Sequence, residues 1–246
     1  MTDPRVGVID KRLGKINNLI AVSSGKGGVG KSLIASLLAV ILARKGYKVG
    51  LFDLDFTSPS THVILGVENI YPEEKKGIIP PRVHGLKYMS IVYYSGEYAS
   101  PLRGVDISNA LIELLAITRW NSLDFLIIDM PPGIGDATLD IIRLIKRIDF
   151  LIVTTPSRLA FETVRKLINL LSELKVPIIG VIENMKVKES RFIQRQVEGR
   201  NIAFLGEIPF DALLEDAIGN VYKLLNIEFG KKLGEIVKNF EAIEKQ

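Results

Sequence analysis

Residues near the start of the chain have the composition of a phosphate-binding loop. Residues 25–32 read GKGGVGKS and match the pattern G-x-x-x-x-G-K-[ST]. Glycines let backbone N–H groups surround a phosphate, and a following helix points its positive end at the same anion. Lys31 suits the β- and γ-phosphates, and the Ser32 hydroxyl suits Mg²⁺. A glycine-rich turn with an accidental lysine is the alternative. The predicted nucleotide contacts here are Gly25, Lys26, Gly27, Gly28, Val29, Gly30, Lys31, Ser32 and Leu33.

Two carboxylates, Asp53 and Asp55, end the apolar segment that starts at residue 49. Ligands bind outside the carboxyl ends of strands in an open parallel sheet, so both would arrive near the phosphates. Asp53 suits holding a water on Mg²⁺, and Asp55 suits orienting the attacking water. From the residues alone, a pair that caps a helix beginning near Ser58 explains them equally well.

A third carboxylate, Asp129, ends the apolar run 125–128 and precedes the residues MPPG. Downstream of a phosphate loop, such a strand is typical of a Walker B motif, whose aspartate reaches Mg²⁺ through water. The predicted metal residues are therefore Ser32, Asp53 and Asp129. We expect the Gly133 N–H to bind the γ-phosphate, which would make residues 133–136 a nucleotide-sensing switch.

Apolar segments that alternate with helical patterns must position these residues. The strands lack polar alternation, which is typical of strands covered on both faces. We expect strands at 19–23, 49–54, 125–129, 150–154, 178–183 and 204–208, and an edge strand at 86–92. We expect helices at 32–44, 106–120, 137–146, 160–174 and 229–244. The alternation predicts an α/β fold: a doubly wound, mostly parallel sheet with helices on both faces, in three layers.

The length of the chain fits one domain over residues 1–246, with an N-terminal arm over 1–16 and a C-terminal helix over 229–246. Residues 68–82 read as an inserted loop. Apolar residues at 229, 233, 236, 237 and 240 share one face of the last helix. Packing on its own sheet is favoured over membrane binding, because lysine and glutamate mix on the polar face.

The composition excludes several kinds of chemistry. Among 246 residues there is no cysteine, which excludes disulfides, thiolate nucleophiles and cysteine-ligated iron–sulfur clusters. The two histidines, His62 and His84, do not have metal-ligand spacing. A net charge of +4 demands no anionic partner. We find neither a signal segment nor an apolar run long enough for a membrane span, so a cytoplasmic protein is expected.

The motifs GKGGVGKS, LFDLDFTSPS, FLIIDMPPGIGD, VTTPSRLAFETVRK, VIENM and LGEIPFD occur in an order that resembles the Mrp/ApbC family. These are P-loop ATPases of the MinD/ParA/nitrogenase-iron-protein class, and the resemblance covers about residues 14–216. It implies a slow, partner-stimulated, Mg²⁺-dependent ATPase that forms a homodimer around ATP. The implied cofactors are ATP or ADP and Mg²⁺, and the client or partner protein stays unknown.

The resemblance also implies roles for single residues. Lys26 resembles the signature lysine that reaches the phosphates of the opposite subunit, and Asp55 resembles the switch I aspartate that assists water attack. With Lys31 of the phosphate loop, the implied catalytic residues are Lys26, Lys31 and Asp55. Asn184 resembles the asparagine that reads the adenine edge, and Pro209 and Asp211 resemble the loop beside the base. From the residues alone, Lys26 is a solvated side chain and Asn184 is a strand-end turn residue.

Two departures from the family pattern bear on function. Leu33 stands where the family usually has threonine, so a hydroxyl toward the α-phosphate is missing and altered nucleotide affinity is expected. The family usually carries C-x-x-C after the Asn-Met motif and shares a [4Fe–4S] cluster between subunits. Here residues 186–199 read KVKESRFIQRQVEG, so no cysteine-ligated cluster is expected.

Three functional hypotheses follow. The first is an ATPase that couples hydrolysis to delivery of a cluster or client. The second is a non-enzymatic cluster scaffold, against which the cysteine count argues. The third is a MinD/ParA-like positioning ATPase whose ATP dimer binds a membrane, DNA or a protein. The basic residues at 186, 188, 191, 195 and 200 favour a solvated helix face over a DNA- or partner-binding surface.

Overall fold

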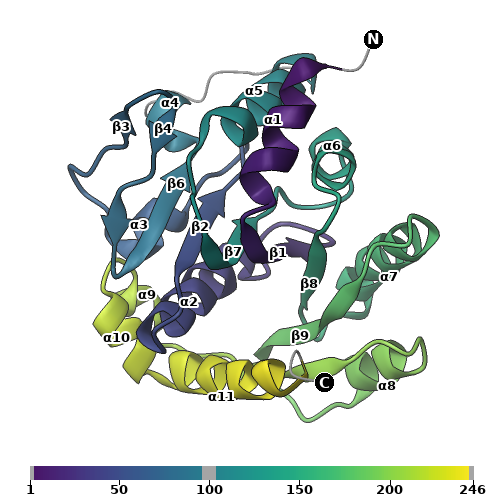
Figure 1. Cartoon of the computed structure of the whole chain (residues 1–246). Helices are drawn as coiled ribbons and strands as arrows, with labels where there is room; N and C mark the ends of the chain where they lie inside the picture. The colour runs from purple at the N-terminus through teal and green to yellow at the C-terminus, as the bar shows by residue number, and fades with distance from the viewer. Residues whose placement is uncertain (1–2, 96–103, 244–246) are drawn as a thin grey trace.

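A twisted sheet covered by helices on both faces forms the centre of the computed structural model, which describes residues 3–95 and 104–243 (Figure 1). The main sheet contains β1 (Ile16–Ser24), β2 (Val49–Asp53), β5 (Arg82–Val83), β6 (Leu86–Ser90), β7 (Leu123–Asp129), β8 (Asp149–Thr154), β9 (Ile178–Lys186) and β10 (Phe204–Pro209). Their order is β10-β9-β8-β1-β7-β2-β6-β5. All neighbours are parallel except β5 and β6. The predicted doubly wound α/β fold is confirmed.

The helices are connected to the strands as in a doubly wound sheet. They are α1 (Pro4–Leu13), α2 (Lys31–Arg44), α3 (Thr61–Leu65), α4 (Val92–Ser95), α5 (Gly104–Ile117), α6 (Asp136–Leu144), α7 (Arg158–Glu173), α8 (Phe192–Glu198), α9 (Leu214–Ala217), α10 (Val221–Asn226) and α11 (Glu228–Ile243). The order of the strands places β1 in the middle of the sheet, with β7 on one side and β8 on the other.

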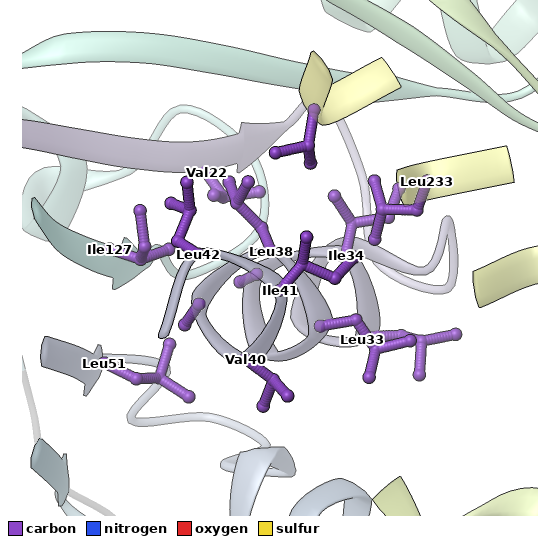
Figure 2. Close-up of a cluster of buried hydrophobic side chains, with 14 of the residues drawn as sticks. Val22, Leu33, Ile34, Leu38, Val40, Ile41, Leu42, Leu51, Ile127 and Leu233 are labelled. Atoms are coloured by element: carbon purple, nitrogen blue, oxygen red, sulfur yellow. The ribbon is translucent and has the colours of Figure 1, made fainter. Parts of the chain in front are cut away.

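Two apolar layers cover the two faces of the sheet. In β1, Ile20 and Val22 pack into the layer around α2, whereas Leu19 and Ala21 pack into the layer that α5, α6 and α7 share. This division explains why the strands are apolar at successive positions. Helix α2 is itself covered on its far side by α11, with Leu233 beside it (Figure 2). The packing on both sides fixes the end of α2 that carries the phosphate loop.

Several predicted elements change in the structure. The expected N-terminal arm contains α1, which buries Ile9 and Leu13 against α5 and α6. The expected edge strand 86–92 ends at Ser90, and β5 lies outside it. The loop 68–82 contains the small two-stranded sheet of β3 (Glu73–Glu74) and β4 (Ile78–Ile79).

The last helix packs on its own fold, as expected. Helix α11 begins one residue earlier than predicted, and the described part buries Phe229, Leu233, Ile236 and Val237 against α2 and β10. Residues 244–246 of the expected helix lie outside the described residues, as does the side chain of Phe240.

Candidate functional site

The phosphate loop connects β1 to α2 at the carboxyl edge of the sheet. Gly28 and Gly30 have φ of +74° and +84°, in the left-handed region that favours glycine. Gly25 is needed for a different reason. A Cβ there would collide with the Thr163 hydroxyl and lie 2.6 Å from the backbone nitrogen of Val164 in α7. Gly28 and Gly30 thus allow the loop its left-handed conformations, and Gly25 allows its close contact with α7.

Lys31 joins residues from three separate segments at this edge. Its Nζ donates to Asp129 Oδ1 at 2.5 Å and to Ser32 Oγ at 3.1 Å. The same Nζ lies 3.6 Å from Asp55 Oδ2. All of these side chains except Ser32 are buried. The predicted lysine and two of the predicted carboxylates therefore form one cluster.

Two of the carboxylates sit in a strongly desolvated environment. Burial raises the pKa of Asp129 to about 7, although Lys31 beside it favours the charged form. Burial also raises the pKa of Asp53, whose carboxylate accepts hydrogen bonds from the Asp55 N–H at 3.0 Å and the Thr61 hydroxyl at 2.6 Å. Groups with such shifted pKa values gather at functional sites more often than elsewhere.

The cluster can accept a hydrated cation. Asp129 Oδ2 is buried and has no hydrogen-bond partner among the described residues, so it is an unused acceptor next to Ser32. Within the described part of the chain, no group of three or more His, Cys, Asp or Glu side chains could hold a metal alone. Ser32, Asp53 and Asp129 therefore fit Mg²⁺ in the way that phosphate sites use it, with water and phosphate oxygens completing the shell.

Asp55 has a structural role as well as its place beside Lys31. Its Oδ1 accepts from the Thr57 N–H at 3.1 Å, the Thr57 hydroxyl at 2.5 Å and the Ser58 N–H at 3.1 Å. These contacts fix the turn that follows β2 and leave Oδ2 facing Lys31. The turn-forming and catalytic interpretations of this residue are thus compatible.

A pocket of about 340 Å³ lies over the loop. Its lining includes the predicted Lys26, Gly27, Gly28, Gly30, Lys31, Ser32, Leu33 and Asp55. It also includes residues that sequence reasoning missed, namely Ser24, Thr57, Ser58, Ser60, Ile64 and Pro132. The hydroxyl-rich run directly after Asp55 was the available signal for three of them.

Lys26 is exposed and forms no ion pair among the described residues. Leu33, where the family usually has threonine, is 6% exposed and packs in the apolar layer around α2. Lys26 is thus directed to solvent, whereas Leu33 is buried between the loop pocket and the apolar layer.

The remaining predicted residues lie outside this pocket. The Gly133 N–H donates to the Ser24 carbonyl at 2.9 Å, so a phosphate contact would require that bond to open. Asn184 lies within β9, buried, and donates to the Val29 carbonyl at 2.9 Å rather than forming a turn. Pro209 ends β10, and the Asp211 carboxylate accepts from the N–H groups of Leu213 and Phe229, both at 3.0 Å.

A larger hollow of about 920 Å³ lies beside α8. Arg191 and Arg195, from the basic stretch, line it together with Arg158 and Glu207. Lys186 is instead held by Glu183 at 2.7 Å and Glu207 at 2.8 Å. The pocket over the predicted phosphate loop is therefore the smaller of these two cavities. In the described residues, no helix is long and apolar enough to cross a membrane.

The parallel sheet, the glycine loop before α2 and the buried lysine–carboxylate cluster define a nucleotide-binding P-loop NTPase. A family model described as ParA, NUBPL iron-transfer P-loop NTPase, matches residues 15–243. The chain belongs to this family, and the predicted Mrp/ApbC resemblance is confirmed.

Relatives in this family include iron-sulfur cluster carrier proteins. One from Methanocaldococcus jannaschii is 37% identical, with 96% of this chain and 88% of the relative covered. One from Pseudomonas fragi is 41% identical, with 71% and 62% covered. The chloroplastic Fe-S cluster assembly factor HCF101 of Arabidopsis thaliana is 44% identical, with 70% and 33% covered. The chain thus spans less than two thirds of the length of two of these three curated relatives.

Solved structures agree with this assignment. A nucleotide-binding protein from Archaeoglobus fulgidus in complex with ADP has a TM-score of 0.77 at 33% identity, with 92% of this chain and 96% of that one covered. MinD of Pyrococcus horikoshii with Mg-ADP has a TM-score of 0.69 at 20% identity, with 93% and 97% covered. The second likeness concerns the fold alone.

Proposed function

We propose that this chain binds ATP with Mg²⁺ and hydrolyses it to ADP and phosphate. The observation that carries the proposal is the convergence of Lys31, Ser32, Asp55 and Asp129 at the mouth of the phosphate loop, with Lys31 Nζ 2.5 Å and 3.6 Å from the two carboxylates. A buried cation beside a glycine loop is suited to a polyphosphate, because its charge is poorly screened there.

Each side chain has a part in the proposed reaction. Lys31 exchanges its contact with Asp129 for the β- and γ-phosphate oxygens. Mg²⁺ would be held directly by Ser32 and through water by Asp53 and Asp129. When bound, it neutralises charge on the phosphates. Asp55 Oδ2 orients the attacking water, while its Oδ1 stays fixed by Thr57 and Ser58. Asn184, Pro209 and Asp211 would lie beside the adenine.

The same edge supports the proposed homodimer. Lys26 is exposed and unpaired in the described structure, so it is free to reach a nucleotide in a second copy. At the same edge of the sheet, Ile134, Leu159 and Val187 are 41%, 83% and 76% exposed. They follow the carboxyl ends of β7, β8 and β9, and apolar exposure at one edge is typical of a contact surface.

The cargo is inferred from the relatives, two of which are called iron-sulfur cluster carrier proteins. This chain has no cysteine, so it offers no thiolate to an iron–sulfur cluster. We propose that ATP turnover acts on a client that brings its own cluster ligands. Anaerobic reconstitution with iron and sulfide, followed by absorbance, tests this. A stoichiometric cluster on the isolated chain would contradict it.

The Lys31→Ala variant tests the enzyme. We expect ATP turnover to fall by about 10²–10⁴-fold, because a preorganised charge contact to the transition state is lost. The measurement is phosphate release with Mg²⁺, with Lys48→Ala as a control, since Lys48 is exposed and lies at the opposite end of β2. A circular dichroism spectrum confirms folding. Unchanged turnover in folded Lys31→Ala would refute the catalytic proposal.

Sizing chromatography with light scattering tests the dimer. The wild-type chain should dimerise with ATP and Mg²⁺, and Lys26→Ala should stay monomeric while retaining nucleotide binding, because its cation acts across the interface. Lys48→Ala again serves as the control. Dimerisation that persists in Lys26→Ala would remove Lys26 from the proposed contact.

A further inference from the structure

A second pocket lies at the opposite edge of the sheet from the phosphate loop. It has a volume of about 490 Å³ and lies between α1 and the turn that leads into β7. Pockets of this size commonly hold small molecules. Helix α1 ends just before β1 begins, so the length of β1, about 25 Å, separates this pocket from the phosphate loop. It is not an extension of the nucleotide site.

The lining of this pocket is positively charged. Lys11, Arg12, Lys15 and Arg119 line it, and none of the lining residues that the structure describes is acidic. Lys11 and Lys15 are exposed and form no ion pair among the described residues. Within residues 3–95 and 104–243, the guanidinium groups of Arg12 and Arg119 donate only to backbone carbonyls, those of Thr118 at 3.4 Å and Lys75 at 2.8 Å. Four cations thus line one cavity without a neutralising carboxylate in that part of the chain.

The charges around the arginines crowd one another. Burial lowers the pKa of Arg12, and the nearby Arg119 lowers it further. An anion in the pocket would relieve this repulsion.

The indole of Trp120 supplies an independent sign of a ligand. Trp120 is 1% exposed and lines the pocket, and its Nε1 is buried without a hydrogen-bond partner among the described residues. The far corner of its six-membered ring packs toward Gly50 in β2, where a Cβ would lie 2.8 Å from Cζ3. The N–H corner of the indole therefore lies at the end of the side chain that points away from Gly50. Buried donors without an acceptor are rare and unfavourable.

We propose that this pocket binds a small, multiply charged oxyanion, a carboxylate or phosphate compound, with the four cations around it and the Trp120 N–H as a donor. Such a ligand would neutralise the cluster and satisfy the buried indole. The site is separate from the proposed ATPase and does not depend on it.

The protein contains one tryptophan, so its intrinsic fluorescence reports directly on this pocket. The probes are pyrophosphate for the phosphate class and citrate for the carboxylate class, each titrated at constant ionic strength. Lys31→Ala is titrated alongside, to remove the phosphate loop as a competing site. We expect a saturable fluorescence change with at least one probe, equal in wild type and Lys31→Ala.

The charge variant is Lys11→Gln with Lys15→Gln, since both side chains are exposed and dispensable for packing. Its affinity for the probe should fall about tenfold or more, because charge-assisted contacts are lost. Lys166→Gln with Lys175→Gln, two exposed lysines at α7, carries the same charge change as a matched control. Calorimetry on Trp120→Phe, which keeps the ring but removes the N–H, should also show weaker binding.

Four results would overturn the proposal. The first two are the lack of a saturable fluorescence change with either probe and an equal fluorescence change with chloride. The third is an equal loss of affinity in the Lys166→Gln/Lys175→Gln control. The fourth is loss of binding in Lys31→Ala, which would reassign the signal to the phosphate loop. Failure here would leave the ATPase proposal intact, because that one is tested by turnover.

Discussion

The Lys31–Asp129 pair is the most consequential contact at the scale of single residues. Both side chains are almost fully buried, and their 2.5 Å contact is charge-assisted. Removing one partner of a buried pair leaves an uncompensated charge, which is strongly destabilising. Lys31 is therefore held ready beside the loop by a carboxylate, and its exchange to a phosphate replaces one anionic partner with another.

The raised pKa of Asp129 gives a pH prediction. Its pKa rises from 3.8 to about 7 on folding, so the folded state binds more protons between about pH 4 and 7. The contribution of Asp129 to the free energy of unfolding should be fully present below pH 4 and lost as pH rises through 7. The slope is at most about 1.4 kcal/mol per pH unit.

Urea unfolding of wild type and Asp129→Asn at pH 5, 6, 7 and 8 measures this contribution. As pH rises, the free energy of unfolding of the wild type should fall relative to that of Asp129→Asn. Asp124→Asn, which changes a more exposed aspartate of the same strand, is the control. A difference that is constant across the series would show that the Asp129 pKa is not raised.

The position of a residue could be predicted from the sequence where the order of parallel strands fixes it. It could not be predicted where contacts between distant parts of the chain fix it. Asp55 and Asp129 meet Lys31 because parallel strands end at one edge of the sheet. The Asn184 contact to Val29 joins residues that are 155 positions apart, and no local pattern encodes it. The cap that Asp211 provides for Phe229 depends on where α11 returns to the sheet, so it too was beyond the sequence.

At the scale of elements, the approach of the phosphate loop to α7 is set by Gly25. A Cβ at this position would press on the Thr163 side chain and on the backbone of Val164, which cannot move without shifting the helix. The helix is anchored by Phe161 and Leu167 in the apolar layer, so the loop would have to yield.

Gly25→Ala should therefore lower both stability and nucleotide affinity, with a stability loss of about 1–3 kcal/mol from overpacking. Gly27→Ala is its matched control for stability, because a Cβ there meets nothing within 4 Å and Gly27 lacks a positive φ. Thermal unfolding of both variants measures the stability loss, and titration of Gly25→Ala with ADP measures the loss of affinity. Equal melting temperatures of the two variants would contradict the close-packing argument.

Elements with long apolar runs were predicted to within a few residues, whereas short or charged ones were missed. The strands β1, β2, β7, β8, β9 and β10 contain the predicted segments, apart from Leu54, which lies beyond the end of β2. Helix α1 was read as an arm because its sequence is charged, although Asp3 caps it and Pro4 occupies its first position. Helix α8 is only seven residues long, too short to be stable on its own. Its formation depends on the burial of Ile193 and Val197 against the rest of the fold.

At the scale of the whole molecule, exposed apolar side chains mark the edge that carries the phosphate loop. Leu159 is 83% exposed at the start of α7, and Leu174, at its other end, is 47% exposed. The two leucines lie at opposite edges of the sheet. Comparing them therefore distinguishes a contact surface from the apolar exposure that any protein surface has.

Leu159→Gln should weaken ATP-dependent dimerisation by about tenfold or more, since it removes apolar area at the proposed interface. Leu174→Gln should leave dimerisation unchanged. Neither should alter the melting temperature of the monomer by more than about 2 °C, since both are surface changes. The measurement is the dissociation constant from analytical ultracentrifugation. Equal effects of the two variants would place the interface elsewhere.

The central position of β1 also has a consequence for biosynthesis. Its two neighbours in the sheet begin at Leu123 and Asp149, so the first strand made has no partner until much of the chain has left the ribosome. During that interval an apolar strand is exposed to chaperones and to aggregation. The loop contact from Asn184 arrives later still. A nascent chain that ends before β9 should therefore lack a finished phosphate loop, and the nucleotide should reach its site only near the end of translation.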